Sequence, residues 1–495
     1  MARKSITKNY IYNLIYQIMV LILPLITTPY ISRVLGAENI GIYSYTLSIS
    51  AYFILFGSLG IALYGQREIA YNQENKKKYS KILYEIVILR FITMVISMAI
   101  FYFVFVNGKQ YQMYYKILLL ELLANSLDIS WFFQGLEEFK KTILRNIVVK
   151  LISIICIFVF VKTSYDLKKY FMIYVLSILI GNLSLWAYLP KYIEKINYKT
   201  LNIFKHIKPT IGLFIPQIAI QVYTVLDKTM IGAIISNKAE VGFYEQSQKI
   251  IKILLTVVTA LGTVMVPRMA NVYIKKEKGQ MTNYMKKSFC FMYLLAFPII
   301  FGMISISDEF VPIFFGPGYD RVSMLMKIIS PIILMIGMSN VIGTQYLLPT
   351  KRQREYTISV VLGAIINFVM NFILIGRYGA VGASIGTVIA ETMVTVVQMY
   401  YIRNDFNIKK IVNAAKKYFI ASICMFVYCC IIGYIVKSGI QSLVIKILGG
   451  MIVYFVMLFI LKDDFIYEIK QKVLKNNRGW NLWIRWLKKM VILYI

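Results

Sequence analysis

The chain has 495 residues, of which 59% are hydrophobic and only 16% are charged. A soluble protein devotes about a quarter of its residues to Asp, Glu, Lys and Arg, so this composition excludes a water-soluble fold and places the chain in a lipid bilayer. The 55 basic and 23 acidic residues give a net charge of +32. In a membrane protein this excess indicates topology, and we expect no nucleic-acid partner.

Fourteen apolar stretches are long enough to cross about 30 Å of hydrocarbon, which takes roughly 20 helical residues each. In chain order they span residues 11–32, 40–64, 82–106, 111–134, 145–162, 168–189, 209–236, 242–267, 288–307, 322–349, 355–376, 380–402, 411–436 and 440–461. The sequence therefore predicts an all-α integral membrane protein with about 14 transmembrane helices.

The connections between these stretches alternate in charge. The segments predicted inside, from residues 1–10 to 462–495, hold 38 Lys and Arg, whereas the segments predicted outside hold 9. Because basic residues collect in cytoplasmic loops, both termini are predicted to be cytoplasmic. The first stretch is too long for a signal peptide and lacks a small-residue cleavage site, so we expect a retained helix.

An internal repeat indicates how the helices are grouped. Residues 37–43, after the first stretch, and 239–244, after the seventh, both read Ala-Glu and then contain Gly and Tyr. Six helices separate the copies, an even number, which gives both halves the same orientation. This predicts two six-helix lobes related by a pseudo-two-fold axis along the membrane normal, plus two extra helices. The predicted divisions are an N-lobe at 1–189, a cytoplasmic linker at 190–208, a C-lobe at 209–402, the extra helices at 403–461 and a basic cytoplasmic tail at 462–495.

The tail and the rarer residue types carry weaker signals. Apolar and aromatic residues recur from 480 to 494 at spacings of three and four, which predicts an amphipathic helix lying in the membrane interface. The five cysteines lie in apolar stretches and are odd in number, so no disulfide framework is expected. The single histidine, His206, excludes a multi-histidine metal centre and is expected in a loop before the seventh span.

Four stretches carry a family resemblance. They are residues 23–36 followed by Gly41-Ile42-Tyr43, residues 131–135 (Trp-Phe-Phe-Gln-Gly), residues 226–232 leading to Gly242-Phe243-Tyr244, and residues 376–383. In register along nearly the whole chain, they resemble the polysaccharide-type flippases. These are the O-antigen and capsule repeat-unit translocases of the multidrug/oligosaccharidyl-lipid/polysaccharide exporter superfamily.

The resemblance implies a transporter and not an enzyme. Such a protein moves a polyprenyl-(pyro)phosphate-linked oligosaccharide repeat unit from the inner to the outer leaflet by alternating access, for surface polysaccharide biosynthesis. It also implies the plasma (inner) membrane of a bacterium, with membrane lipid, a polysaccharide polymerase and glycosyltransferases as partners. An anionic diphosphate and sugar hydroxyls do not cross hydrocarbon unaided, so a polar, cationic cleft is expected.

Basic residues within the predicted spans are the candidate substrate-binding groups. A lone cation at mid-depth costs several kcal/mol, so each should face water or a carboxylate. Arg90, Lys228 and Lys252 are the deepest and are predicted to bind the diphosphate. Lys116 and Lys327 are further candidates, with snorkelling to the interface as their alternative.

Two of these predictions have structural alternatives. Arg90 is expected at nearly the depth of Glu121 on the antiparallel fourth span, where the two would form a buried ion pair. Lys252 follows Lys249 by three residues, and Glu245 precedes Lys249 by four, which also suits a self-neutralising stripe on one helix face.

Acidic residues in the spans are candidates for coupling transport to an ion. The resemblance implies a Na+ or H+ gradient as the driving force, and no other cofactor is expected. The candidate coupling-ion residues are Asp227, Asp128 and Glu391. Their alternative is charge compensation of a neighbouring Lys or Arg.

Prolines supply candidate hinges. Pro24 and Pro29 in the first span and Pro216 in the seventh interrupt helices that are repeat partners. Because proline removes a backbone hydrogen bond, we expect kinks that bend during opening and closing, with a static packing kink as the alternative.

Two other functions are open at this point. A cation-coupled small-molecule exporter of the same superfamily would need a cleft lined with carboxylates, whereas the cation excess in the spans favours an anionic substrate. A membrane glycosyltransferase or polymerase would need a large outer loop or a paired acidic motif. The one acidic pair near the outer surface, Asp308-Glu309, lies in a short predicted turn.

Overall fold

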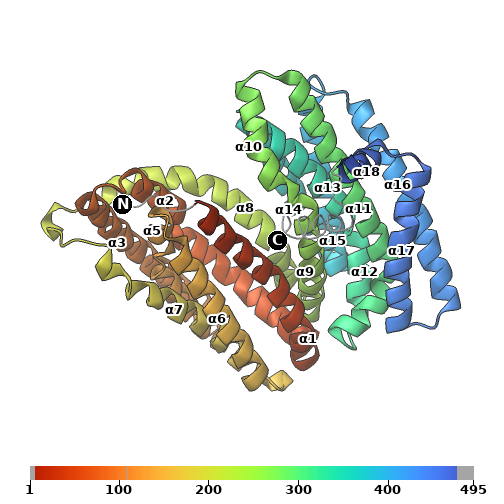
Figure 1. Cartoon of the computed structure of the whole chain (residues 1–495). Helices are drawn as coiled ribbons and strands as arrows, with labels where there is room; N and C mark the ends of the chain where they lie inside the picture. The colour runs from red at the N-terminus through yellow and green to blue at the C-terminus, as the bar shows by residue number, and fades with distance from the viewer. Residues whose placement is uncertain (1–5, 109, 476–495) are drawn as a thin grey trace. The chain divides into compact units, whose positions relative to one another are not determined.

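The computed structural model describes residues 6–108 and 110–475, and within these the chain is helical without any strand (Figure 1). Contacts group the chain into two compact units, Met1–Gly242 and Phe243–Ile495. The first unit contains α1 (Ile6–Ser58), α2 (Ile61–Tyr71), α3 (Lys76–Phe101), α4 (Gln112–Ser126), α5 (Ser130–Gly135), α6 (Phe139–Phe160), α7 (Leu167–Trp186) and α8 (Ile207–Ile234).

The second unit holds the remaining helices. They are α9, which starts at the unit boundary (Ala239–Thr259), α10 (Leu261–Ile274), α11 (Lys278–Phe315), α12 (Asp320–Ile329), α13 (Ile332–Ser339), α14 (Gln353–Tyr378), α15 (Ala380–Ile402), α16 (Ile408–Ile435), α17 (Ile440–Ile460) and α18 (Asp464–Lys475). Two short π-helical segments, Tyr102–Val106 and Asn340–Leu347, extend α3 and α13. The interfacial helix predicted at residues 480–494 lies outside the described residues.

The predicted membrane spans are confirmed as helices. Twelve stretches of the described residues are helical, long and apolar enough to cross a membrane. The first of them, Met19–Tyr71, contains the first and second predicted spans, and α8 corresponds to the seventh. Every one of the fourteen predicted spans therefore lies mainly in helix, and the protein is an all-α multi-pass membrane protein.

Exposed apolar rows mark the helix faces that suit lipid. Phe103 on the extension of α3 and Phe372 on α14 are 72% and 71% exposed. Helix α6 presents a row of such side chains, which comprises Leu144, Val148, Leu151, Ile152, Ile155 and Val159. Exposing this apolar area to water would cost free energy, whereas contact with the lipid tails of a bilayer does not.

Helix α1 joins two predicted spans through one glycine. The helix runs for 53 residues, and its only non-helical dihedrals are at Gly36 (φ 76°, ψ 168°), inside the predicted outer turn 33–39. A positive φ suits glycine, which has no Cβ to clash. Pro24 and Pro29 both lie within the helical part before this break. Pro216 lies within α8, where its side chain is not among those that the structure describes.

The two repeat copies meet inside the first unit. A Cβ added to Gly41 would lie 1.7 Å from the carbonyl oxygen of Lys238, and one added to Gly242 would lie 2.1 Å from that of Ala37. These distances are far below van der Waals contact, so the two backbones touch at a point where only glycine fits.

Helix α8 belongs by its contacts to the first unit, because it packs against α1 and α2. The sequence-based division assigns 209–402 to a second lobe, whereas the contact grouping changes at Gly242. Hydrogen bonds tie the connection before α8 to α3. They include Tyr79 Oη to the Tyr192 carbonyl (2.8 Å), the Glu194 amide to Ser80 Oγ (3.0 Å) and the Asn202 amide to Glu85 Oε1 (2.8 Å).

In the second unit, α17 is joined to α11 by an ion pair and hydrogen bonds. Lys446 Nζ lies 2.6 Å from Glu309 Oε1, and the side chains are only 7% and 10% exposed. Ser442 Oγ donates to the same carboxylate oxygen (3.0 Å), and Tyr454 Oη donates to the Leu294 carbonyl (2.9 Å). Lys446 is therefore held by a carboxylate inside the unit.

Candidate functional site

The fourth predicted span is broken near its end, between α4 and α5. Helix α4 ends at Ser126, α5 begins at Ser130, and Leu127 adopts dihedrals outside the helical range (φ −90°, ψ 1°). Asp128 starts the new segment by accepting a hydrogen bond from the Ser130 amide through Oδ1 (2.9 Å). Aspartate favours such breaks, because its side chain replaces a helical acceptor.

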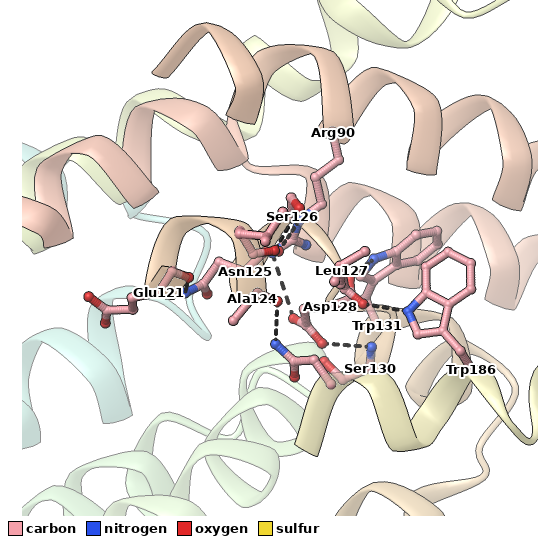
Figure 2. Close-up of polar contacts among 12 residues, drawn as sticks. Arg90, Glu121, Ala124, Asn125, Ser126, Leu127, Asp128, Ser130, Trp131 and Trp186 are labelled. Atoms are coloured by element: carbon pink, nitrogen blue, oxygen red, sulfur yellow. Dashed lines mark hydrogen bonds and ion pairs between the residues drawn. The ribbon is translucent and has the colours of Figure 1, made fainter. Parts of the chain in front are cut away.

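Side chains from α3, α5 and α7 cap the carbonyls that the break releases (Figure 2). The capping bonds run from Asn182 Nδ2 to Ala124 (2.7 Å), Arg90 Nε to Asn125 (2.9 Å), Trp186 Nε1 to Leu127 (2.7 Å) and Trp131 Nε1 to Asp128 (3.1 Å). In an apolar environment each released carbonyl needs such a donor. The junction is therefore a buried polar site inside a bundle of membrane-spanning helices.

Arg90 is the charged centre of this junction. Its side chain is buried, and Nη2 lies 3.7 Å from Asp128 Oδ2. Its third nitrogen, Nη1, has no hydrogen-bond partner among the described residues. Arg90 thus keeps one buried donor, Nη1, available beyond its pair with Asp128. This pair is the charge compensation that the sequence gave as the alternative role of Asp128.

Glu121 has partners other than the one expected from its depth. Its two oxygens accept from Ser50 Oγ (2.8 Å) and Tyr174 Oη (2.9 Å). The structure therefore pairs Arg90 with Asp128, and hydroxyl groups from α1 and α7 satisfy Glu121.

Asn182 extends the junction toward a second arginine that the sequence analysis missed. While its Nδ2 caps Ala124, its Oδ1 accepts from Arg145 Nη1 (2.9 Å). Arg145 was counted with the inner loop before the fifth span, whereas it lies inside α6. Arg145 stands at the boundary of the fifth predicted span, 145–162, and the sequence pattern did not show on which side of this boundary it lies.

The other predicted site residues are divided between the units. In the first unit, Asp227 is buried in α8, Lys228 beside it is partly buried, and Lys116 on α4 is exposed. In the second unit, Lys252 on α9 is exposed, Glu391 on α15 is buried, and Lys327 on α12 forms an ion pair with Asp308. The structure thus brings Arg90 and Asp128 together, and the roles of the others stay predictions.

His206 is buried instead of lying free in a loop. Its side chain is 2% exposed, with Nδ1 2.7 Å from Tyr64 Oη and Nε2 2.9 Å from Glu85 Oε2. Lys205 Nζ lies 2.6 Å from the same Glu85 oxygen. Burial lowers the pKa of His206 below its usual value. The contacts suit a neutral imidazole that donates to Glu85 and accepts from Tyr64.

Two family models match the chain. The model described as "Polysaccharide biosynthesis protein" matches residues 6–273, and the model described as "MatE" matches residues 213–373. The first match contains the α4–α5 junction and all its capping residues.

Curated relatives show the same likeness. The chain is 26% identical over 407 residues to the "Putative O-antigen transporter" of Escherichia coli (strain K12), covering 81% of this chain and 97% of that protein. It is 27% identical over 261 residues to the "Probable low-salt glycan biosynthesis flippase Agl15" of Haloferax volcanii, covering 51% and 52% of the two chains.

Solved structures share the fold. The lipid II flippase MurJ in an inward closed conformation superposes with a TM-score of 0.73 at 15% identity, covering 92% of this chain and 100% of that one. An inward-facing multidrug resistance MATE family transporter of the MOP superfamily gives 0.59 at 11% identity, covering 80% and 96%. At these identities the likeness establishes a common helical fold.

Proposed function

The chain belongs to the polysaccharide biosynthesis protein family, and from this membership we propose that it is a flippase for a lipid-linked oligosaccharide. It moves a polyprenyl-(pyro)phosphate-linked repeat unit from the inner to the outer leaflet by alternating access, for surface polysaccharide biosynthesis. The observation that carries the proposal is the family match over residues 6–273, more than half of the chain. The resemblance to an O-antigen transporter over 81% of the chain supports it.

The buried arginine of the junction supports an anionic substrate. A guanidinium inside the membrane is costly unless it is paired, and Arg90 has one acid partner and a donor to spare. Phosphate oxygens are strong acceptors for such a donor. In the proposed cycle Arg90 is joined by Lys228 and Lys252, with Lys116 and Lys327 as further contacts.

The energy source in this proposal is a Na+ or H+ gradient. Asp227, Asp128 and Glu391 remain the proposed coupling residues, and burial of Asp227 and Glu391 within spans is in keeping with that role. Bending of the helices that contain Pro24, Pro29 and Pro216 is the proposed conformational change.

The proposed location is the plasma membrane of a bacterium, with both termini cytoplasmic. The excess of 38 over 9 basic residues between the predicted inner and outer segments supports this orientation. Glycosyltransferases would assemble the substrate on the inner face, and a polymerase would consume it on the outer face.

A reconstituted assay tests the proposal. The purified chain is placed in proteoliposomes with a fluorescent polyprenyl diphosphate oligosaccharide, and an impermeant quencher reports outward movement. We expect faster movement than in protein-free liposomes, and slower movement with Arg90→Lys, Lys228→Ala and Lys252→Ala. Lys437→Ala, an exposed cation in the turn between α16 and α17, is the matched control and should behave as the parent.

The same preparation distinguishes the second candidate function. The match of residues 213–373 to the MatE model favours a small-molecule exporter as the alternative. Export of a cationic dye, driven by Na+ or H+ and without movement of the lipid-linked sugar, would replace the flippase proposal with that alternative.

A further inference from the structure

A mainly apolar cavity with a polar, basic patch lies inside the first unit, separate from the residues predicted to bind the substrate. It has a volume of about 390 Å³, is open on one side and is lined by α1, α6 and α7. Leucine, proline and isoleucine side chains of α1 and apolar side chains of α6 and α7 form most of its wall, and the basic side chains on it come from α6. Small-ligand sites have volumes of about 300–1,000 Å³, so the cavity has room for a diphosphate and one sugar but not for a whole repeat unit.

The charge of this cavity has one sign. Arg145 and Lys150 line it, and none of its seventeen lining residues, all of which the structure describes, is acidic. The apolar protein and lipid around such a cavity screen charges weakly, so two cations on one wall favour an anion.

Hydrogen bonds through Asn182 fix the position of the Arg145 guanidinium. Its Nη1 donates to Asn182 Oδ1 (2.9 Å), and the amide of Asn182 is fixed in turn by its bond to the Ala124 carbonyl (2.7 Å). A guanidinium fixed in this way loses little conformational entropy when it binds a ligand, and it can present a planar pair of donors to phosphate.

The carboxylate of Glu121, which is hydrogen-bonded to a cavity-lining tyrosine, does not line the cavity. Tyr174 lines the cavity, and its hydroxyl donates outward to Glu121 Oε1 (2.9 Å), while Ser50 satisfies the other oxygen (2.8 Å). The lining therefore offers an aromatic ring and neutral hydroxyls next to the cations. Tyr170 and Ser177 continue this neutral polar surface.

We infer that this cavity binds the phosphate-bearing head of a polyprenyl-linked sugar, with Arg145 and Lys150 on the phosphate. The inference rests on the proposed function and adds to it a further binding site for the same headgroup, apart from Arg90, Lys228 and Lys252. Tyr170, Tyr174 and Ser177 lie against the first sugar, because rings and hydroxyls suit a sugar face. Asn182 is a positioning residue that acts through Arg145.

The test measures binding to the purified full chain in detergent. The probes are undecaprenyl diphosphate carrying one sugar, phosphatidylglycerol and inorganic pyrophosphate, with native mass spectrometry and thermal unfolding as readouts. We expect Arg145→Gln and Lys150→Gln to weaken binding of the first probe roughly 10- to 100-fold, since a charge-assisted hydrogen bond contributes about 1.5–3 kcal/mol. Lys140→Gln, an exposed cation on the same helix α6, should bind within about twofold of the parent.

Three outcomes overturn the inference. Unchanged binding in both Arg145→Gln and Lys150→Gln removes the cavity as the site. Equal competition by phosphatidylglycerol assigns it to an ordinary membrane phospholipid, and equal competition by pyrophosphate assigns it to a free anion. Arg145→Lys, which keeps the charge, should recover part of the binding and shows that the loss is not misfolding.

Failure of the proposed function gives a different pattern. If the parent chain binds the sugar-linked probe in an Arg145-dependent way but does not move it across proteoliposomes, the cavity stands and the flippase proposal fails. If the parent moves the substrate and Arg145→Gln moves it equally fast with equal affinity, the cavity fails and the flippase proposal stands.

Discussion

Arg90 is held by groups that the interrupted fourth span supplies, so its removal affects the fold as well as any substrate. Arg90→Ala leaves the Asn125 carbonyl without its donor and Asp128 without its cation. Loss of one partner of a buried pair costs about 3–5 kcal/mol, and we expect a matching fall in the free energy of unfolding, measured by thermal unfolding in detergent. Arg67→Ala, at an exposed arginine on α2, should change it by less than about 0.5 kcal/mol.

The comparison with Arg90→Lys separates charge from geometry. Lysine keeps a cation near Asp128 but lacks the fork of donors, so an intermediate stability is expected. If Arg90→Ala unfolds at the same temperature as the parent, the junction does not depend on Arg90.

His206 gives the first unit a dependence on pH. Its pKa in the folded chain lies below the usual value of about 6.5, because burial outweighs the neighbouring Glu85. The unfolded chain therefore takes up a proton first on acidification. The stabilising contribution is present above about pH 6.5 and is lost as the pH falls through the folded pKa.

The measurement is the unfolding temperature at about pH 7.5 and 5.5. The parent should lose more stability on acidification than His206→Gln, which has no titrating ring. Since His206 is the single histidine of the sequence, the difference between the two chains isolates it. An equal loss in both would show that the buried imidazole is not linked to pH.

The limits of sequence reasoning are clear at individual charges. The depth of Arg90 in its span followed from counting residues, and this depth indicated Glu121 as its partner, whereas the structure pairs it with Asp128. The choice between Glu121 and Asp128 depends on how α4 is rotated and where it breaks, and hydrophobicity that is nearly uniform around a buried helix does not encode rotation. Lys446 shows the same limit, because Glu309 was assigned to an outer turn but lies inside α11.

At the scale of elements, the closest approach is between the two repeat copies. Gly41→Ala would force a methyl group into the Lys238 carbonyl, and backbone atoms have little freedom to yield. We expect a loss of at least about 3 kcal/mol in the free energy of unfolding or failure to accumulate in the membrane.

Gly212→Ala is the matched control for this substitution. Gly212 lies in α8, and a Cβ there would meet no atom within 4 Å. It should be neutral or stabilise the helix by up to about 1 kcal/mol, since alanine favours helix over glycine. Similar behaviour of the two variants would contradict the crossing at Gly41.

The elements themselves were largely predictable, because bilayer thickness sets the length of an apolar run. The α4–α5 break was not, since a Leu-Asp pair in an apolar stretch is equally compatible with a continuous helix that faces a cation. The repeat of Ala-Glu with Gly and Tyr marked the site of close packing, although sequence alone gave no reason to expect the two copies to touch.

At the scale of the whole molecule, the charge pattern predicts which loops face the cytoplasm. On a chain with its five cysteines replaced by alanine, an impermeant maleimide should label Lys437→Cys in intact cells. It should label Gln73→Cys, in the loop between α2 and α3, only after the cells are opened. Both positions are exposed. The reverse pattern would invert the topology and with it the proposed direction of transport.

The hydrogen bonds between the α7–α8 connection and α3 predict how the protein behaves after proteolytic cleavage in this connection. Hydrogen bonds hold this connection at Glu194 and again at Asn202, while residues 195–200 between them are largely exposed. Trypsin cleavage after Lys199 should therefore leave both new ends fastened to the same helix, and the two fragments should copurify. Separation of the fragments on size-exclusion chromatography would show that the covalent link is needed. Copurification would make this position suitable for split reporters or for expressing the protein as two polypeptides.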